Sequence, residues 1–193
     1  MAEVIVFHHA QGLTPGCLSF ADRLRAAGHV VHTPDLYDGK TFANLTDGVS
    51  YAREVGFETI LARGQLAAEE LPSEIVYAGF SLGVPTAQML AQTRPGARGA
   101  LLLYSCVPPS EFGGSWPSGV PVQIHMMDRD EWVVPPNEDL AAARELAETV
   151  ESAQLFLYPG DRHLFADSSV SDYDPAAATL LMERVLSFLA DIE

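Results

Sequence analysis

Ile75-Val76-Tyr77-Ala78-Gly79-Phe80-Ser81-Leu82-Gly83 is the stretch that decides the fold of this chain. It starts as a short apolar run, which is typical of a buried strand, and it closes with a Gly-x-Ser-x-Gly sequence. Val84-Pro85-Thr86-Ala87 follows and predicts the first turn of a helix. A strand, this turn and a helix in that order are the context of a nucleophile elbow. The pattern therefore indicates Ser81 as a nucleophile.

The two glycines of the turn have a steric reason. A serine on a sharp strand-to-helix turn has a strained backbone, and neighbouring Cβ atoms would collide there. Gly79 and Gly83 lack those atoms, so that the strand and the helix can approach each other. The amide of Leu82 then lies at a helix N-terminus, where N–H groups have no partner within the helix. Leu82 is thus a candidate donor to an anionic oxygen.

The composition favours a single globular domain spanning residues 1–193, with 48% apolar residues for its core. A formal charge of −15 argues against nucleic acid and anionic membranes as partners. Cys17 and Cys106 give no disulfide framework, and neither a signal peptide nor a membrane span is evident. We therefore expect a cytoplasmic protein, either a monomer or a homodimer.

Apolar strands alternate with helical segments along the chain. Val4-Ile5-Val6-Phe7, for example, is the β-branched and aromatic run expected of a strand buried on both faces. The predicted strands are 4–7, 29–33, 75–80, 99–104, 120–127 and 153–158, and the predicted helices are 16–27, 44–70 with a break near Gly56, 84–93, 137–149 and 175–190. Such alternation predicts an α/β fold with a doubly wound, mostly parallel sheet of about six strands or more and helices on both faces. No insertion is long enough for a cap domain.

A serine hydroxyl is a weak nucleophile, so it needs a base and a third group that orients the base. In folds with this elbow the chain order is serine, acid, histidine. Only His125 and His163 follow Ser81. His125 lies inside an apolar strand, where a core histidine is expected, whereas His163 follows the last strand at the sheet edge where ligands bind. We therefore predict His163 as the base.

The acid is expected in the loop after the preceding strand. Asp128 and Asp130 both lie there, and Asp130 is preferred because it lies further into the turn. Asp161 is only two residues from His163, which is poor geometry for orienting it, so we interpret Asp161 as a turn residue. The spacing leaves Asp128 as the alternative to Asp130.

An oxyanion needs two aligned N–H donors. One is Leu82, and the other is expected from the loop after the first strand, with Ala10 as the candidate. The doublet His8-His9 in that loop raises the question of a metal site, but adjacent strand residues point to opposite faces and no second cluster of ligand residues is evident. We expect neither a metal nor a cofactor.

With these residues placed, the chain resembles the dienelactone hydrolase family over nearly its whole length. The matching stretches are His8 to Leu13, Thr33 to Tyr37, Gly79 to Gly83, Asp130 to Val133, Tyr158 to Phe165, and Asp172 to Asp174. The resemblance implies a compact α/β-hydrolase without a cap. It also implies that Asp130 and His163 join Ser81 in a triad, and that the amides of Ala10 and Leu82 form the oxyanion hole.

Three positions depart from the family pattern. The name-giving enzymes use a cysteine as the nucleophile where this chain has Ser81. They carry a glutamate in the first loop where this chain has His9. They also grip the substrate carboxylate with an arginine where this chain has Asp167. These departures argue against dienelactone itself as the substrate.

The function indicated is a serine hydrolase that cleaves a small ester or lactone through an acyl-enzyme on Ser81. The alternative is a small-ligand-binding protein with the same fold and no turnover. The predicted walls of the substrate pocket are His9, Tyr37, Phe80, Trp132, Leu164 and Phe165. Because these walls are mostly apolar and the chain is acidic, we expect uncharged acyl esters to be preferred over carboxylate-bearing lactones. Arg129 and Arg162, beside the acid and the base, are the cations that could reverse this preference.

Overall fold

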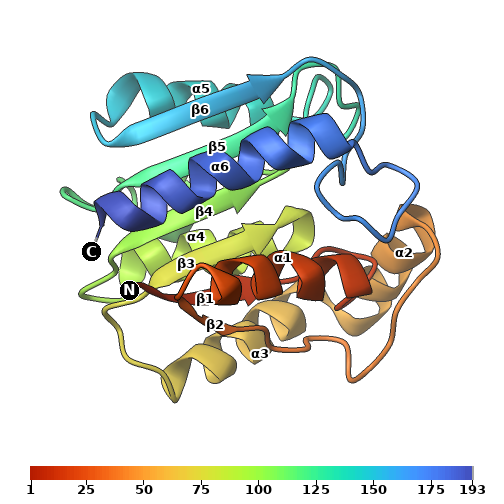
Figure 1. The fold of residues 1–193 in the computed structure, drawn as a ribbon, viewed down its shortest axis with the longest axis horizontal. Coiled ribbons are helices and arrows are strands. Elements are labelled where there is room, and N and C mark those ends of the chain that lie inside the picture. The colour runs from red at the N-terminus through yellow and green to blue at the C-terminus, as the bar shows by residue number, and fades with distance from the viewer. Residues whose placement is uncertain (193) are drawn as a thin grey trace.

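The described part of the chain is residues 1–192 of a computed structural model, and it forms a six-stranded parallel sheet covered by helices (Figure 1). The strands are β1 (Glu3–Phe7), β2 (Val30–His32), β3 (Val76–Phe80), β4 (Gly99–Leu103), β5 (Val122–Met127) and β6 (Ala153–Tyr158). Every neighbouring pair is parallel, in the spatial order β2-β1-β3-β4-β5-β6. All strands therefore end at the same edge of the sheet.

The direction in which strands are added reverses next to β1. The chain first places β2 on one side of β1 and then returns to place β3 on the other side. In open parallel sheets, ligands bind outside the carboxyl ends of the strands at such a switch point. The loop that follows β1 and the turn that follows β3 meet at this position.

Helices cover both faces of the sheet. Figure 1 shows α1 and α6 in front of it and α3, α4 and α5 behind it. The helices are α1 (Pro15–Ala26), α2 (Leu45–Val55), α3 (Phe57–Glu69), α4 (Val84–Thr93), α5 (Asp139–Thr149) and α6 (Pro175–Asp191), with short 3₁₀ turns η1 (Ser81–Gly83) and η2 (Pro109–Phe112). Among the described residues, no helix combines the length and the apolar character needed to cross a membrane.

Each face of the sheet has its own hydrophobic core, because successive strand side chains point to opposite faces. Val4 and Val6 of β1 pack with α1 and α6, whereas Ile5 and Phe7 pack with the helices on the other face. All four side chains are buried, which explains why the strand is apolar at each of these four positions and does not alternate.

The predicted α/β architecture without a cap domain is confirmed. The break expected near Gly56 is present, since this residue ends α2 and precedes α3 with a φ of 91° that favours glycine. Asp174 caps α6 and accepts hydrogen bonds from the amides of Ala176 and Ala177. The segment 105–119, between two of the predicted strands, contains the additional turn η2.

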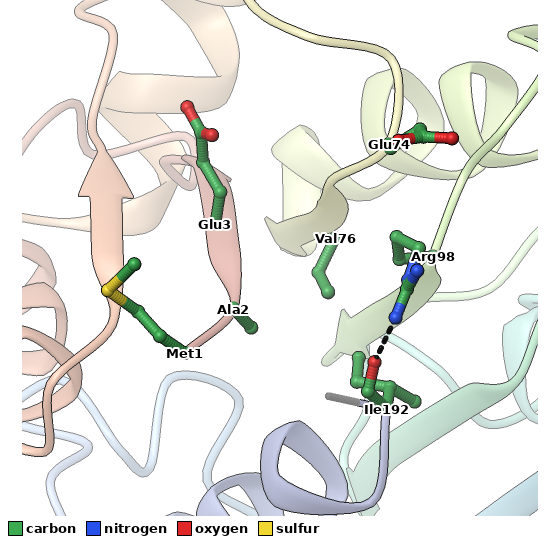
Figure 2. Close-up of a pocket in the computed structure, with 7 residues that line it drawn as sticks. All are labelled: Met1, Ala2, Glu3, Glu74, Val76, Arg98 and Ile192. Carbon is green, nitrogen blue, oxygen red and sulfur yellow. Dashed lines mark hydrogen bonds between the residues drawn. The ribbon is translucent and has the colours of Figure 1, made fainter.

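A pocket of about 450 Å³ lies at the opposite edge of the sheet, at the amino ends of β1, β3 and β4 (Figure 2). It is lined by Met1, Ala2, Glu3, Glu74, Val76, Arg98 and Ile192. Within it the Arg98 guanidinium donates a hydrogen bond of 2.6 Å to the carbonyl of Ile192. Because Ser81 follows the carboxyl end of β3, this pocket is not continuous with the candidate active site.

Candidate active site

Ser81 sits on the sharp turn that connects β3 to α4. Its φ is +48°, a conformation that is uncommon for a residue with a side chain. The flanking glycines make room for it: a Cβ on Gly79 would lie 2.5 Å from the carbonyl oxygen of Gly83, and a Cβ on Gly83 would collide with the carbonyl oxygen of Phe7. The turn thus has the strained backbone and close packing of a nucleophile elbow.

Ser81, His163 and Asp130 come together across three strand ends. Ser81 Oγ lies 2.7 Å from His163 Nε2, and His163 Nδ1 lies 2.6 Å from Asp130 Oδ2. The histidine and the aspartate are buried, whereas the serine is half-buried. A carboxylate can only accept at Nδ1, so the imidazole carries its proton there and offers an unprotonated Nε2 to the hydroxyl. Such an arrangement can remove a proton from the serine.

The loop after β5 holds the carboxylate of Asp130 in place. Asp130 Oδ1 accepts a 2.9 Å hydrogen bond from the amide of Trp132, which leaves Oδ2 for His163. Asp128, the alternative acid, is exposed and accepts a 2.9 Å hydrogen bond from the amide of Gly160. The structure therefore places Asp130, and not Asp128, against the imidazole.

Two aromatic side chains flank His163. The ring centroid of Trp132 lies 5.8 Å from that of the imidazole, and this indole is 37% exposed at the surface. Tyr104, fully buried, lies 5.9 Å from the imidazole, and its hydroxyl accepts a 3.0 Å hydrogen bond from the amide of Ala166. Burial raises the pKa of Tyr104, so the phenol stays neutral in this position. Tyr104 thereby fixes the loop that carries the histidine.

The candidate oxyanion-hole residues lie in the predicted places. Ala10 is in the loop after β1 and is buried, and its amide donates no hydrogen bond to any residue from 1 to 192. Helix α2 packs tightly on this loop, because a Cβ on Gly48 would collide with the carbonyl oxygen of Ala10. Leu82 directly follows Ser81 in η1. Both amides are thus at the switch point of the sheet.

His9 and Asp167, two of the positions that depart from the family pattern, contact each other. His9 Nε2 lies 2.7 Å from Asp167 Oδ2, and both side chains are almost fully buried. The same carboxylate oxygen accepts a 2.5 Å hydrogen bond from Thr14 Oγ1. Burial raises the pKa of Asp167, but hydrogen bonds from His9, Ser169 and Thr14 outweigh it and hold this pKa at about 2. The charge of Asp167 is therefore compensated inside the protein and is not presented to a substrate.

The protonation state of the His9 ring follows from the hydrogen bond that its Nδ1 atom makes. Burial lowers the pKa of His9, whereas the neighbouring Cys17 and Asp167 raise it. The amide of Gln11, however, donates a 3.2 Å hydrogen bond to Nδ1, and this contact favours a ring protonated at Nε2 alone. In that form Nε2–H donates to Asp167, which stays ionised.

His9, Cys17 and Asp167 also form a group of potential metal ligands that the sequence did not reveal. Their ligand atoms lie within 4.8 Å of one another, and all three residues are buried. Asp167 Oδ2 is already engaged with His9 at 2.7 Å and with Cys17 Sγ at 3.8 Å. The separation of 2.7 Å is that of a hydrogen bond between the ligand atoms themselves, so this cluster is satisfied by its own contacts.

Most of the predicted pocket walls lie inside the protein. Phe80, Leu164 and Phe165 belong to the core beneath α1 and α6, and Tyr37 belongs to the core on the other face. Each is at most 1% exposed. For these four residues, and for His9, which is fully buried against Asp167, the prediction requires correction, because packed helices and neighbouring side chains occupy the space where a substrate was expected. Of the predicted walls, Trp132 alone is exposed.

The remaining histidines at this edge are structural in their contacts. His8 donates from Nδ1 to the carbonyl of His9 and accepts at Nε2 from the amide of Leu36. Burial lowers its pKa to about 4, and burial lowers the pKa of His125, inside β5, to about 3. Both rings stay neutral at physiological pH, and His125 bonds to Tyr158 and not to the serine.

Neither arginine beside the site points a free guanidinium at it. Arg129 is exposed and lies 3.5 Å from the carboxylate of Asp128. Arg162 donates a 2.6 Å hydrogen bond to the carbonyl of Tyr173. Both guanidinium groups that could have bound an anionic substrate therefore already contact another group of the protein.

Three residues at the site were not singled out from the sequence. Tyr104 adopts a φ of +72°, which no local signal predicts for a tyrosine. Thr14, recognisable as a cap of α1, also binds Asp167, and Cys17 lies beside the same carboxylate. The contacts with Asp167 join residues about 150 positions apart in the chain, as the separations of 153 and 150 show.

The parallel sheet, the elbow after β3 and the serine–histidine–aspartate contacts together define a hydrolase of the α/β-hydrolase class. A sequence model described as the dienelactone hydrolase family matches residues 1–193, and the chain belongs to this family. No curated protein matches the chain.

Solved structures share the fold at low sequence identity. A dienelactone hydrolase-like promiscuous phosphotriesterase from metagenomic libraries is 18% identical, with a TM-score of 0.77 over 100% of this chain and 87% of the other. A dienelactone hydrolase from Anabaena variabilis is 16% identical, with a TM-score of 0.65 over 99% of this chain and 86% of the other. The esterase PE8 is 15% identical, with a TM-score of 0.66 over 100% of this chain and 93% of the other. These similarities concern the fold.

Proposed function

We propose that this protein is a serine hydrolase that cleaves a small ester or lactone through an acyl-enzyme formed on Ser81. The single observation that carries the proposal is the continuous contact from Ser81 Oγ to His163 Nε2 at 2.7 Å and from His163 Nδ1 to Asp130 Oδ2 at 2.6 Å. A serine needs this base, and the base needs an orienting acid, before the hydroxyl becomes an effective nucleophile.

In the first half of the reaction, Ser81 Oγ forms a bond to the ester carbonyl carbon while His163 Nε2 takes the hydroxyl proton. Asp130 stabilises the imidazolium through the bond from Nδ1–H. When the tetrahedral intermediate collapses, the bond from the carbonyl carbon to the alkoxy oxygen breaks. His163 then returns its proton to the departing alcohol.

In the second half, water attacks the acyl group on Ser81, with His163 again taking a proton. The acid product leaves and the serine regains its hydrogen. The amides of Ala10 and Leu82 stabilise the negative oxygen of both tetrahedral intermediates. Loss of one such donor typically lowers kcat by about 10²–10³-fold.

The substrate is expected to be small and uncharged near the reacting carbon. The half-buried serine is partly open to solvent, and no lid covers it among the described residues. Neither Arg129 nor Arg162 offers a free cation, and Asp167 is paired with His9. A carboxylate-bearing substrate would therefore find no partner for its charge here.

The direct test is turnover of 4-nitrophenyl acetate by the wild type, by Ser81→Ala and by Ser105→Ala. Ser105 is a matched control, since it also follows the end of a central strand but bonds to Asp139 at 2.5 Å. We expect Ser81→Ala to lose turnover by several orders of magnitude and Ser105→Ala to retain it. Folded wild-type protein that binds esters without turnover would instead support the alternative of a ligand-binding protein.

A further inference from the structure

An apolar groove of about 550 Å³ lies beside the nucleophile elbow, between the start of α3, the first turn of α4 and η2. Its apolar lining consists of Phe57, Ile60, Leu61, Leu82, Pro85 and Phe112. The remaining lining residues are Thr86, in the floor, and two glutamates. This volume lies within the range of about 300–1,000 Å³ that small-molecule sites occupy.

The groove and the candidate active site share Leu82. The amide of Leu82 is the proposed oxyanion donor, and the residue itself lines the groove. Since Leu82 directly follows Ser81, the groove begins one residue away from the atom that would carry the acyl group. A chain attached to that acyl carbon therefore has an apolar surface next to it.

The lining is apolar surface that the protein leaves in contact with water. Phe57 is 52% exposed, and Leu61, Leu82, Pro85 and Phe112 are half-buried. Covering such surface with hydrocarbon is favourable in proportion to the area removed from water. By contrast, the predicted walls Phe80, Leu164 and Phe165 have no exposed surface to offer.

The charges of the groove restrict its occupant. Glu58 and Glu111 are exposed among the lining residues, and no lysine or arginine lines the groove. A carboxylate at the far end of a bound chain would be repelled by these side chains and would lack a cation. An uncharged hydrocarbon chain meets neither penalty.

We propose, on the basis of the function proposed above, that this groove binds the acyl chain of the substrate. The substrate class is then an ester with an uncharged, apolar acyl chain of several carbons. The acyl part is the appropriate occupant because it stays on Ser81 throughout the acyl-enzyme stage, whereas the alcohol departs.

The first experiment measures kcat/KM for 4-nitrophenyl acetate, butyrate, hexanoate and octanoate. Each fully buried methylene contributes about fourfold, so burial of only two of the methylenes added between acetate and octanoate should raise kcat/KM at least about tenfold. Phe57→Asp is the test variant, because this exposed side chain lines the groove and an acidic residue suits the first turn of α3. Leu66→Asp is the matched control on the same helix, 65% exposed and outside the groove.

We expect Phe57→Asp to lower octanoate turnover at least about tenfold while acetate turnover stays within about twofold, and Leu66→Asp to change neither. If acetate turnover depends on Ser81 but kcat/KM does not rise along the acyl series, the proposal that the groove binds the acyl chain is wrong, and the proposed hydrolase function still holds. Equal effects of Phe57→Asp and Leu66→Asp on octanoate turnover would also contradict acyl-chain binding in the groove. A gain seen only when the alcohol chain is lengthened would assign the groove to the alcohol and contradict the inference.

A binding measurement separates this inference from the proposed function. Octanamide and acetamide are uncharged and need no turnover, so their affinities can be compared by titration calorimetry in the wild type and in Phe57→Asp. We expect octanamide to bind more tightly than acetamide, and this difference to disappear in the variant. If octanamide binds no more tightly than acetamide, the proposal that the groove binds the acyl chain is wrong, whether or not the protein hydrolyses esters.

Reversing the charge of the two glutamates tests whether they exclude anionic chains from the groove. Replacing Glu58 and Glu111 with lysine should raise kcat/KM for an ester whose octanoyl chain ends in a carboxylate, and should leave the neutral octanoate ester within about twofold. The gain should shrink as salt increases, because both positions are exposed. An unchanged ratio of the two substrates would show that the chain does not reach these side chains.

Discussion

Replacement of Asp130 by asparagine tests how the base is oriented. The change keeps the size of the side chain and removes its charge. In the wild type, Oδ1 of Asp130 accepts from the amide of Trp132 at 2.9 Å, and Oδ2 accepts from His163 Nδ1 at 2.6 Å. Because the amide of Trp132 still needs an acceptor, the asparagine would turn its oxygen to Trp132 and its NH₂ group to the imidazole.

That orientation places the NH₂ group of the asparagine opposite Nδ1 of His163, which donates a hydrogen bond in the wild type. His163 would then carry its proton on Nε2, and this nitrogen could no longer accept the proton of Ser81. We expect kcat to fall by about 10³–10⁴-fold, as when a triad acid loses its charge but keeps its shape. The substrate contacts are untouched, so KM should change little.

Asp128→Asn is the matched control. Asp128 is exposed, and its Oδ1 accepts from the amide of Gly160, a contact that asparagine can keep. We expect its kcat/KM to stay within about threefold of the wild type, in line with other surface changes. The assay is kcat/KM for 4-nitrophenyl acetate, with thermal unfolding to confirm that both variants are folded. An active Asp130→Asn, or an inactive Asp128→Asn, would refute the reasoning.

Two further outcomes are expected. The pKa of Asp167 is about 2 in the folded protein, below that of an unfolded carboxyl group, so its stabilising contribution of roughly 2 kcal/mol is present above pH ~4 and is lost as the pH falls towards 2. Urea unfolding at pH 5 and at pH 2.5 should therefore show a larger loss for the wild type than for Asp167→Asn, and equal losses would contradict the pairing with His9. Gly83→Ala should destabilise the fold by about 1–3 kcal/mol because its Cβ meets the carbonyl of Phe7, whereas Gly113→Ala, with open space around it, should show only the smaller cost of its positive φ; thermal unfolding of the two variants checks the order.

The fold was predictable because its signals are local. Each strand is a short apolar run, and the glycines of the elbow together with Gly56 and Gly96 mark where elements end. Chain order and the rule that parallel strands end at one edge then brought Ser81, Asp130 and His163 to neighbouring loops. Neither the local signals nor the chain order depends on how side chains pack.

The pocket walls could not be predicted in the same way. Phe80 adjoins Ser81 in sequence, yet its ring packs edge-on against Phe20 of α1, with the ring centroids 4.9 Å apart. Whether an aromatic residue near a strand end faces a substrate or a helix depends on such tertiary contacts. Phe57 and Phe112 of the groove lie in segments that the sequence marked only as a helix and a loop.

The pairing of His9 with Asp167 was also invisible to the sequence. The two residues are 158 positions apart, and each was interpreted separately as a departure from the family pattern. Their contact changes the meaning of Asp167, from a charge facing the substrate to a buried partner that ties the loop after β1 to the loop after β6. The expected preference for uncharged esters now depends on the absence of a free cation and on the groove.

The most direct test of the central claim is the site at which a fluorophosphonate, a serine-directed covalent probe, modifies the folded protein. Peptide mapping by mass spectrometry after stoichiometric labelling identifies the modified residue. The geometry predicts one adduct per chain, on Ser81, and at least a hundredfold slower labelling of His163→Gln. An adduct on another serine, such as Ser105, or a folded protein that the probe does not modify, would contradict the assignment of Ser81 as the nucleophile.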